Sequence, residues 1–313
     1  MIDILLGTYN GGAHLDELLR SLEAQSFSDW RLIVRDDGSS DNTLEVLGQW
    51  ASRTARDVML IENRPTAGGA CANFNVLLES SDAPYFAFCD QDDVWLPEKL
   101  ATMLSAVRTC EARHGIDHPV LVHSDLAVVD ASLQPVSPSY WQLLRYDPAH
   151  QSDRRSAFLE NFVTGCATMG NAALRERATP IPDGAIMHDW WVALVATWFG
   201  SLVACPEKTI LYRQHGANVI GASDWSVPAM ARRFAAKPTD SIRRTSRIVQ
   251  RTQTQAGAFA KRYGRSLDPD IASFTARYGA LGIQPFLARK AFMLKERFVP
   301  SYIMRTAFYW LVI

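Results

Sequence analysis

The N-terminal part of the chain alternates short apolar runs with longer segments whose apolar positions recur at helical spacing. The short runs end in turn-forming polar residues and predict strands over 2–7, 30–34, 58–61 and 85–89, of which the first and the last read as buried. The longer segments predict helices over 14–25, 42–50 and 71–80. Strands and helices that alternate through short loops predict an α/β fold with a mostly parallel sheet flanked by helices.

The pattern is less regular beyond residue 115. We expect strands over 120–124 and 126–129, a loop over 134–150, helices over 155–162 and 188–199, and a strand or hairpin over 201–212. After Gly221 the chain changes to basic helical stretches separated by prolines. This change predicts two domains, an α/β domain over 1–222 and a helical, basic C-terminal region over 223–313.

Charge is divided unevenly between these two regions. Residues 1–222 hold 16 Lys and Arg against 28 Asp and Glu, a net charge of −12, whereas residues 223–313 hold 16 against 5, a net charge of +11. The overall net charge of −1 therefore combines two regions of opposite sign. Such asymmetry suggests that the regions have different partners.

Composition places the chain among globular proteins of a reducing compartment. Of its 313 residues, 48% are hydrophobic and 21% are charged, which is not the composition of a disordered chain. Its five cysteines are scattered without a CxxC pair, which favours free thiols over disulfides or a zinc site. No basic leader precedes the apolar run at Ile2, so we expect a cytoplasmic protein.

Polar clusters follow three of the predicted strands, at 8–10, 36–37 and 90–93. Ligands of open parallel sheets collect beyond the carboxyl ends of the strands. The third cluster holds three carboxylates within four residues, Asp90, Asp92 and Asp93, which repel one another unless a cation or solvent neutralises them. Such a turn favours either a Mg²⁺ or Mn²⁺ site that also holds phosphates, or a solvated turn that caps the next helix.

A set of motifs in fixed order resembles one enzyme family. These are ILLGTYNGG, IVRDDGSSDNT, ENRPTAGGACANFN, FCDQDDVW, TGCATMGN, HDWW and YRQHGAN, which together span roughly residues 1–220. The set resembles family 2 glycosyltransferases of the GT-A fold, and in particular bacterial rhamnosyltransferase-like members. The resemblance makes 1–222 the catalytic domain, whereas the C-terminal region carries no motif that matches.

The resemblance assigns the acidic turn to the metal and the diphosphate of a sugar nucleotide. The family's Asp-x-Asp pair matches Asp90 and Asp92, with Asp92 as direct ligand of Mg²⁺ or Mn²⁺ and Asp90 on the ribose or on the metal through water. A metal that bridges the two phosphates stabilises the departing diphosphate. The third carboxylate, Asp93, leaves open which pair carries these contacts.

The ends of the first two strands match the nucleoside pocket of the family. The resemblance implies that Thr8 and Tyr9 contact the base or ribose and that Asp36 accepts a hydrogen bond from N3–H of uracil or thymine. It also places Asn63 and Arg64 in this pocket, beside a Gly-Gly pair whose backbone can approach a phosphate. Taken by itself, the sequence around Asp36 is equally typical of a turn followed by a helix cap.

The segment HDWW matches the place of the catalytic base. Asp189 would remove the proton of the acceptor hydroxyl, a role typically worth about 10²–10⁴-fold in rate. Relatives often carry Glu before this Asp, and His188 removes that carboxylate. Trp190 and Trp191 are acceptor-binding candidates, although two adjacent helical residues cannot face the same way, and Gly165 would border the acceptor site.

The segment YRQHGAN matches a part of relatives that closes over the diphosphate. By this resemblance Arg213 and His215 lie near the phosphates, and His215 is a candidate metal ligand or phosphate donor. A single His after a strand is as often structural as functional.

The C-terminal region combines basic and aromatic residues. Arg289, Lys290, Lys295 and Arg297 interleave with large apolar side chains, and the last segment, 300–313, is apolar but too short to span a bilayer. This pattern favours a helix on an anionic membrane surface, with a helix docked on its own domain or on a second subunit as the alternative. No motif for nucleic-acid binding accompanies the charge.

The sequence therefore predicts an inverting, metal-dependent glycosyltransferase on the inner face of the cell membrane. It would move one sugar, with L-rhamnose from dTDP-L-rhamnose as the best candidate and UDP-sugars as the alternative, to a glycan or lipid-linked glycan of a cell-surface polysaccharide such as O-antigen. The absence of Gln-x-x-Arg-Trp argues against a processive synthase. A non-catalytic sugar-nucleotide or glycan-binding module is the alternative function.

Overall fold

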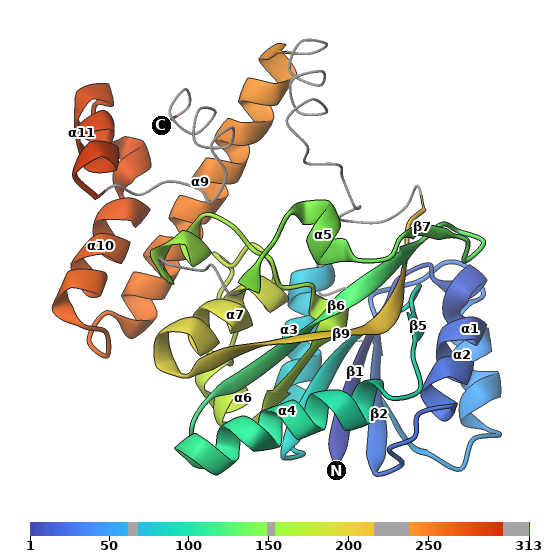
Figure 1. Ribbon diagram of the computed structural model, residues 1–313. Coiled ribbons are helices and arrows are strands. Elements are labelled where there is room, and N and C mark those ends of the chain that lie inside the picture. The colour runs from blue at the N-terminus through green and yellow to red at the C-terminus, as the bar shows by residue number, and fades with distance from the viewer. Residues whose placement is uncertain (62–67, 149–153, 216–237, 297–312) are drawn as a thin grey trace. The chain divides into compact units, whose positions relative to one another are not determined.

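The computed structural model describes residues 1–61, 68–148, 154–215, 238–296 and 313. It divides into two compact units (Figure 1). The N-terminal unit comprises Met1–Pro148, Val163–Ile181 and Met187–Ser223, and the C-terminal unit comprises Ala149–Phe162, Pro182–Ile186 and Asp224–Ile313. The two short segments that join the C-terminal unit were not signalled by the sequence.

The N-terminal unit is built on one curled sheet, in which four parallel strands confirm the predicted runs. They are β1 (Ile2–Thr8), β2 (Trp30–Asp36), β3 (Asp57–Leu60) and β4 (Tyr85–Asp90). Their order in the sheet is β3-β2-β1-β4, which places β1 at the centre of this half. Strands covered on both faces carry near-continuous apolar runs, and Ile2, Ile4, Leu5 and Leu6 of β1 are fully buried.

The second half of the sheet mixes strand directions. It contains β5 (Val94–Trp95), β6 (Val120–Val129), β7 (Pro135–Ser137), β8 (Thr168–Asn171) and β9 (Ser201–Arg213). Strand β8 runs antiparallel to β4 and β6, whereas β9 runs parallel to β6 and antiparallel to β5. The expected strands 120–124 and 126–129 form one continuous strand, and 201–212 forms one long strand with register shifts against β6.

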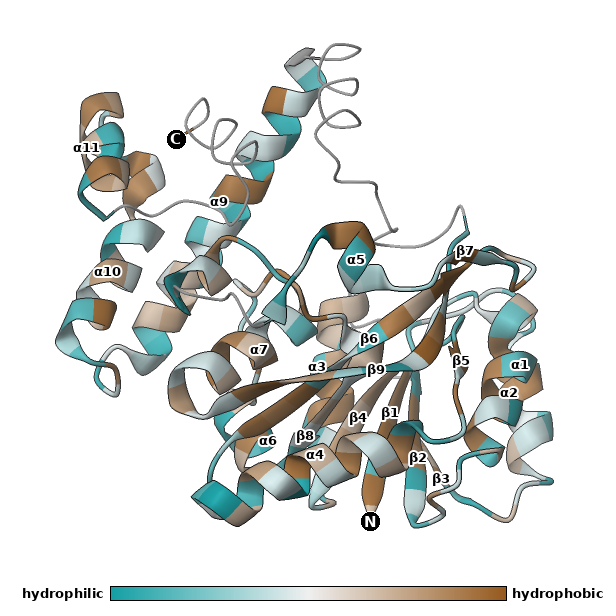
Figure 2. Cartoon of the chain, in the orientation of Figure 1, coloured by the Kyte–Doolittle hydropathy of each residue, from teal (hydrophilic) through white to brown (hydrophobic). Residues whose placement is uncertain are grey.

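Helices cover this sheet, whose strands are largely hydrophobic (Figure 2), and many of the apolar side chains of the strands are buried. They are α1 (Gly12–Glu23), α2 (Thr43–Ala51), α3 (Ala70–Ser80), α4 (Lys99–His114), α5 (Tyr140–Leu144), α6 (Ala172–Ala178) and α7 (His188–Phe199). Helix α3 packs on β1 and β2, α7 packs on β6 and β9, and α4 packs on β6, β8 and β9.

Two local predictions were wrong. The expected loop 134–150 contains β7 and α5, because Ser139 caps the short helix by accepting the Gln142 N–H at 3.0 Å and the buried Asp125 carboxylate accepts the Trp141 N–H at 3.0 Å. The expected helix 155–162 is only a 3₁₀ turn, η2 (Arg154–Phe158). A second 3₁₀ turn, η3 (Gly165–Ala167), precedes β8.

The register of the parallel strands brings the predicted polar clusters to one edge. Thr8 pairs with Asp36 across β1 and β2, and Gly7 pairs with Asp90 across β1 and β4. The carboxyl ends of these strands therefore lie side by side, as ligand sites of α/β sheets require.

The described part of the C-terminal unit is helical, as expected. It contains α9 (Pro238–Tyr263), α10 (Pro269–Gly279), η4 (Leu281–Ile283) and α11 (Phe286–Glu296). Its core is aromatic, with Phe158, Phe259, Phe274, Tyr278 and Phe292 buried together. No helix among the described residues is long and apolar enough to cross a membrane.

Candidate active site

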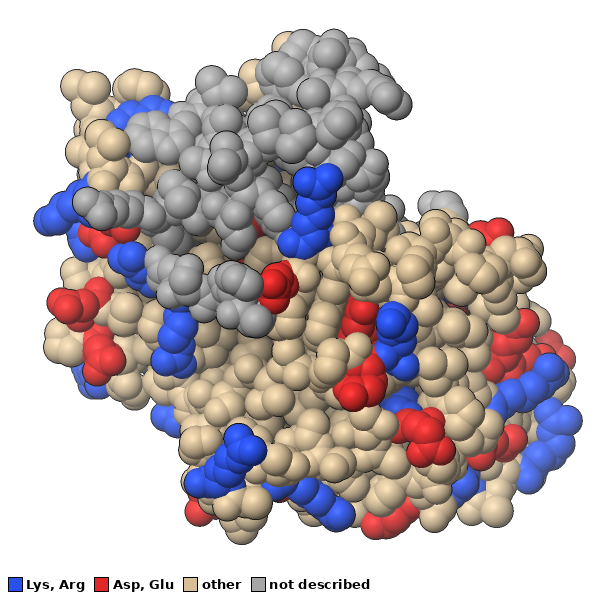
Figure 3. Space-filling view, viewed as in Figure 1, with Lys and Arg blue, Asp and Glu red and all other residues tan. Residues whose placement is uncertain are grey.

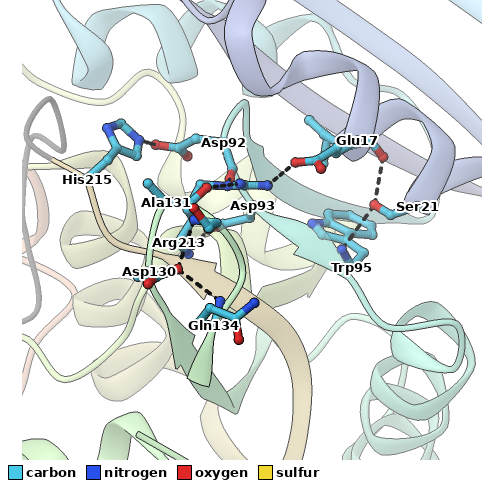
Figure 4. Close-up of polar contacts among 12 residues, drawn as sticks. Glu17, Ser21, Asp92, Asp93, Trp95, Asp130, Ala131, Gln134, Arg213 and His215 are labelled. Carbon is cyan, nitrogen blue, oxygen red and sulfur yellow. Dashed lines mark hydrogen bonds and ion pairs between the residues drawn. The ribbon is translucent and has the colours of Figure 1, made fainter. Parts of the chain in front are cut away.

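The three carboxylates of the acidic turn have different surroundings, and Figure 4 shows two of them, Asp92 and Asp93. Asp92 is 16% exposed and its Oδ2 lies 2.8 Å from Nε2 of His215. Asp93 is fully buried, and its Oδ1 accepts the backbone N–H of Arg213 at 3.1 Å. Asp90, at the end of β4, is half-buried. The turn therefore directs Asp92 toward His215 and Asp93 into the protein.

A buried lysine lies near the inward carboxylate. Lys99 is fully buried, donates to the carbonyl of Cys166 at 2.6 Å and lies 4.3 Å from the ring centroid of Trp95. Burial lowers the pKa of Lys99 to about 8, whereas the neighbouring Asp93 and Asp90 favour its charged form. Burial and the Asp92 charge raise the pKa of Asp93 well above its usual range. Lys99 is therefore a buried cation close enough to Asp93 and Asp90 for their charges to favour its protonated form.

The acidic turn offers ligand atoms that suit a divalent cation. Burial, followed by the charge of Asp92, raises the pKa of Asp90, so these carboxylates repel one another until a cation neutralises them. The carboxylate oxygens of Asp90 and Asp92 are the kind of donor that Mg²⁺ and Mn²⁺ take, and the imidazole of His215 lies beside Asp92. These residues fit the metal that the resemblance implies.

A second grouping overlaps with this one. Asp90, Asp93 and the Cys166 thiol place ligand atoms within 4.8 Å of one another. Thiolates select soft metals rather than Mg²⁺ or Mn²⁺, burial raises the pKa of Cys166 well above its usual range, and the Lys99 ammonium is close by. We therefore favour the Asp90, Asp92 and His215 set for a hard cation.

The nucleoside end of the site is centred on Thr8 and Asp36. The Thr8 hydroxyl donates to Asp36 Oδ1 at 2.9 Å, and the N–H groups of Gly38 and Ser39 donate to Oδ2 at 2.9 and 2.7 Å. The Ser39 hydroxyl donates to Oδ1 as well. A carboxylate accepts about four hydrogen bonds. The geometry therefore gives Asp36 a turn-holding role and leaves it little capacity for the N3–H contact that the resemblance implies.

Tyr9 lies at the mouth of the site, with a side chain that is 58% exposed. Its main chain is held by Gln91, whose amide oxygen accepts the Tyr9 N–H at 2.8 Å and whose amide nitrogen donates to the Tyr9 carbonyl at 2.9 Å. A Cβ on Gly11 would lie only 2.1 Å from Gln91 Oε1, so this clamp requires glycine there. Gln91 thus ties the acidic turn to the end of β1.

Two residues predicted for the nucleoside pocket, Asn63 and Arg64, lie outside the described residues. The Gly-Gly pair that follows is described. Gly68 and Gly69 have φ angles of +88° and +116°, a conformation that favours glycine, and the Gly69 N–H donates to Asp37 Oδ2 at 3.1 Å.

Asp189 begins α7 in a buried, hydrogen-bonded position. It is 9% exposed, and its carboxylate accepts the N–H of Gly165 at 3.0 Å and the N–H of Trp190 at 2.6 Å. Burial raises the pKa of Asp189 to about 6 despite these bonds. A carboxylate with a pKa near the working pH suits a general base. The carboxylate that His188 removes is therefore not needed to raise this pKa.

His188 itself is a neutral core residue. Burial lowers its pKa to about 3, and its ring stacks on Phe74 at a centroid distance of 3.9 Å. A Cβ on Gly165 would lie 2.9 Å from His188 Nε2, so glycine is required for this close approach. Gly165, predicted to border the acceptor, is buried and holds Asp189 through its N–H.

The two tryptophans after Asp189 are separated by burial. Trp191 is fully buried and its indole N–H donates to the Ala178 carbonyl at 3.0 Å. Trp191 is therefore the one of the two candidates whose side chain belongs to the core. Trp190 is only half-buried and remains the acceptor-binding candidate.

Sequence reasoning missed Gln91 and Lys99, and it placed Arg213 differently. Gln91 lies between the two carboxylates of the Asp-x-Asp pair, and Lys99 is the first residue of α4. An excess of acidic residues before an apolar helix could have pointed to a buried cation, because such carboxylates need compensation. The closeness of the Cys166 thiol to Asp90 and Asp93 depends on tertiary structure, and no local sequence pattern indicates it.

The sequence of the chain is similar to proteins of a known family. A family model described as glycosyl transferase family 2 matches residues 3–122. The dTDP-rhamnosyl transferase RfbG of Shigella flexneri is 27% identical over 229 residues, which cover 70% of this chain and 74% of that protein. Matches to the curated relatives span about half to three quarters of their lengths.

Solved structures share the fold at low sequence identity. The structure of S. aureus TarS 1–349 with UDP has a TM-score of 0.52 and 15% identity, covering 91% of this chain and 92% of that chain. The mannosyltransferase PcManGT of Pyrobaculum calidifontis, solved with GDP-Man and Mn²⁺, has a TM-score of 0.52 and 16% identity, covering 99% and 82%. Residues 3–122 thus match glycosyl transferase family 2, curated relatives of the chain are named glycosyltransferases, and solved structures of low sequence identity share its fold.

Proposed function

We propose that the protein transfers one sugar, with inversion and with a bound divalent cation, from a nucleoside diphosphate to a hydroxyl of a surface-polysaccharide acceptor. One observation carries this proposal. Turn η3 contacts both halves of the site, because the Cys166 thiol lies beside Asp90 and Asp93 while the Gly165 N–H binds Asp189. The carboxylate of Asp189 is close enough to affect the pKa of Asp90. A base and a diphosphate site that lie this close can act on one sugar.

The chain's own residues would divide the chemistry as follows. Thr8 and Tyr9 would hold the nucleoside, and Asp90, Asp92 and His215 would hold a Mg²⁺ or Mn²⁺ ion, which when bound neutralises charge on the departing diphosphate. Asp189 would take the proton from the acceptor hydroxyl as it attacks the anomeric carbon from the face opposite the diphosphate. A single displacement of this kind inverts the anomeric configuration.

For the donor we propose a dTDP- or UDP-sugar, with dTDP-L-rhamnose as the first candidate. The name of the Shigella relative, dTDP-rhamnosyl transferase, supports this choice, as does the UDP bound in TarS. The GDP-Man bound in PcManGT makes a third base worth testing.

The donor is tested with a panel of dTDP-, UDP- and GDP-sugars, measuring thermal stabilisation with Mn²⁺ and with EDTA. We expect one donor to stabilise the protein only with the cation, and the same donor to release its nucleoside diphosphate when an acceptor extract is added. Metal-dependent binding without transfer to any acceptor would instead support the non-catalytic binding module. A panel without metal-dependent binding would refute both.

We also propose that the C-terminal unit contacts an anionic membrane surface on the cytoplasmic side, where a lipid-linked acceptor would be presented. Helix α11 and the turn before it expose large apolar side chains, and Leu287 is 78% exposed. Arg289, Lys290 and Lys295 lie on the same helix, and Lys290 Nζ is 4.9 Å from the ring centroid of Phe286. Figure 3 shows Lys and Arg side chains interspersed with Asp and Glu on the face in view. Apolar and basic side chains together suit an interfacial helix.

Sedimentation with anionic phosphatidylglycerol vesicles and with neutral phosphatidylcholine vesicles tests this surface. We expect binding to anionic vesicles that Leu287→Asp abolishes. The matched control is Ile116→Asp, because Ile116 is 75% exposed in the N-terminal unit. Unchanged vesicle binding by Leu287→Asp would contradict the proposal. A shift of that variant from dimer to monomer would assign the surface to a second subunit.

A further inference from the structure

Arg213, at the end of β9, is buried behind the acidic turn. Its side chain is 2% exposed although it carries a full positive charge. Nε donates to the Asp92 carbonyl at 2.8 Å, Nη1 donates to the Ala131 carbonyl at 2.6 Å, and Nη2 binds the Glu17 carboxylate. Figure 4 shows the guanidinium between these three groups. They belong to three separate parts of the N-terminal unit: the acidic turn, the segment after β6, and α1.

The main chain of Arg213 also holds the turn. Strand β5 pairs with β9 through Val94 and Leu211 and through Trp95 and Ile210. Just before this pairing begins, the Arg213 N–H binds Asp93 Oδ1 at 3.1 Å. One residue therefore fixes Asp93 by its main chain and the Asp92 carbonyl by its side chain. The two contacts together determine which way each carboxylate points.

This arrangement differs from the place that the resemblance implies for Arg213. A phosphate ligand must direct its guanidinium into the nucleotide site, whereas this guanidinium is held by protein oxygens and almost fully buried. His215, two residues later, faces Asp92 instead, at 2.8 Å.

We infer that Arg213 is a positioning residue that fixes the register of the acidic turn, so that Asp92 faces His215 and Asp93 faces the interior. Arg213 selects Asp90 and Asp92, rather than Asp93, as the carboxylates available to a divalent cation. The inference rests on the proposed metal site and adds the residue that organises it. Partners that orient metal ligands typically contribute about 10- to 100-fold to metal affinity.

Geometry and simple electrostatics predict opposite effects of removing this side chain. A cation beside a metal site repels the metal, so loss of its charge in Arg213→Met would raise Mn²⁺ affinity if charge were all that mattered. If Arg213 positions the turn, the same variant lowers Mn²⁺ affinity. Arg213→Lys keeps the charge but loses the planar fork that reaches several acceptors. This variant should leave Mn²⁺ affinity unchanged if only charge matters, and lower it if Arg213 positions the turn.

The test is Mn²⁺ affinity of the full-length protein without donor, measured by electron paramagnetic resonance, for wild type, Arg213→Lys and Arg213→Met. We expect both variants to bind Mn²⁺ about 10- to 100-fold more weakly than wild type. Unchanged or stronger binding in either variant would overturn the inference. Wild-type protein that binds no Mn²⁺ would refute the proposed metal site itself, so the two failures are distinguishable.

A milder pair of variants keeps the test decisive if the buried substitutions prevent folding. Glu17→Gln removes the carboxylate charge that binds Arg213 Nη2, and Asp16→Asn makes the same charge change at an exposed neighbouring position on α1. We expect Glu17→Gln to weaken Mn²⁺ binding clearly more than Asp16→Asn does. Equal effects of the two variants would mean that charge alone acts, and would overturn the inference.

Discussion

At the scale of single residues, burial rather than charge pairing prepares the proposed base. Asp189 lacks the neighbouring carboxylate that relatives often carry, because His188 occupies that position and is neutral at physiological pH. Burial alone raises the pKa of Asp189 to about 6, against hydrogen bonds that lower it. Desolvation thus raises the pKa of Asp189, as repulsion from a neighbouring carboxylate would do.

This environment predicts the pH dependence of catalysis. A general base works in its deprotonated form, so kcat should fall as the pH drops through about 6, the pKa to which burial raises Asp189, and level off above it. The profile is measured with donor and Mn²⁺ saturating at every pH, so that titration of the acidic turn does not contribute. A kcat that stays constant from about pH 5 to 8 would contradict this role of burial.

Asp36 provides a second prediction at this scale. Its carboxylate accepts hydrogen bonds from Thr8, Gly38 and Ser39, and an amide cannot replace all of these acceptors. Asp36→Asn should therefore lower the free energy of unfolding by about 1–3 kcal/mol, measured by chemical denaturation. A variant of normal stability that no longer binds nucleotide would instead restore the base-reading role that the resemblance implies.

At the scale of elements, the sequence predicted the parts of the fold that depend on local pattern. Strands β1, β2 and β4 are apolar runs with clear polar ends, and the leucines of α1 recur at helical spacing. Helix α5 was missed because its start depends on Asp125, a distant residue of β6 that accepts the Trp141 N–H. Strand β6 was divided in two because the polar Ser124 and Asp125 interrupt its apolar run, although both are buried.

In the candidate site, too, sequence analysis could name the residues that stand in local motifs but not those whose roles depend on distant contacts. Asp90, Asp92, His215 and Asp189 follow from motifs, which are local. The roles of Lys99, Cys166 and Arg213 depend on contacts between segments far apart in sequence, such as α4 with η3 and β5 with β9. No local pattern reports such contacts.

The crossing of α9 and α10 gives a prediction for an element pair. A Cβ on Gly279 would lie 2.7 Å from the Cα and N of Gly257, whereas a Cβ on Gly257 would meet the nearest atom at 3.8 Å. Gly279→Ala should therefore destabilise the C-terminal helices by about 1–3 kcal/mol through overpacking. Gly257→Ala is the matched control and should be neutral or stabilising, because alanine favours a helix by about 1 kcal/mol. Thermal unfolding of both variants measures the difference, and equal stabilities would refute the close crossing.

At the scale of the whole molecule, the chain combines an acidic N-terminal region, residues 1–222, with a basic C-terminal region, residues 223–313. The net charges of −12 for residues 1–222 and +11 for 223–313 fit a division in which one part binds a cation and a sugar nucleotide while the other contacts an anionic surface. Because the attraction to such a surface is electrostatic, the proposed vesicle binding should weaken as salt is raised from about 0.05 to 0.5 M.

The central claim is that this molecule catalyses sugar transfer with Asp189 as the base. Its most direct test is the rate of transfer by wild type and Asp189→Asn, with the donor selected by the nucleotide-sugar panel and Mn²⁺ saturating. Asparagine keeps the shape of the side chain but cannot take a proton. We expect kcat to fall at least about 100-fold while the donor dissociation constant is unchanged. Full turnover by Asp189→Asn would contradict the assignment of Asp189 as the catalytic base.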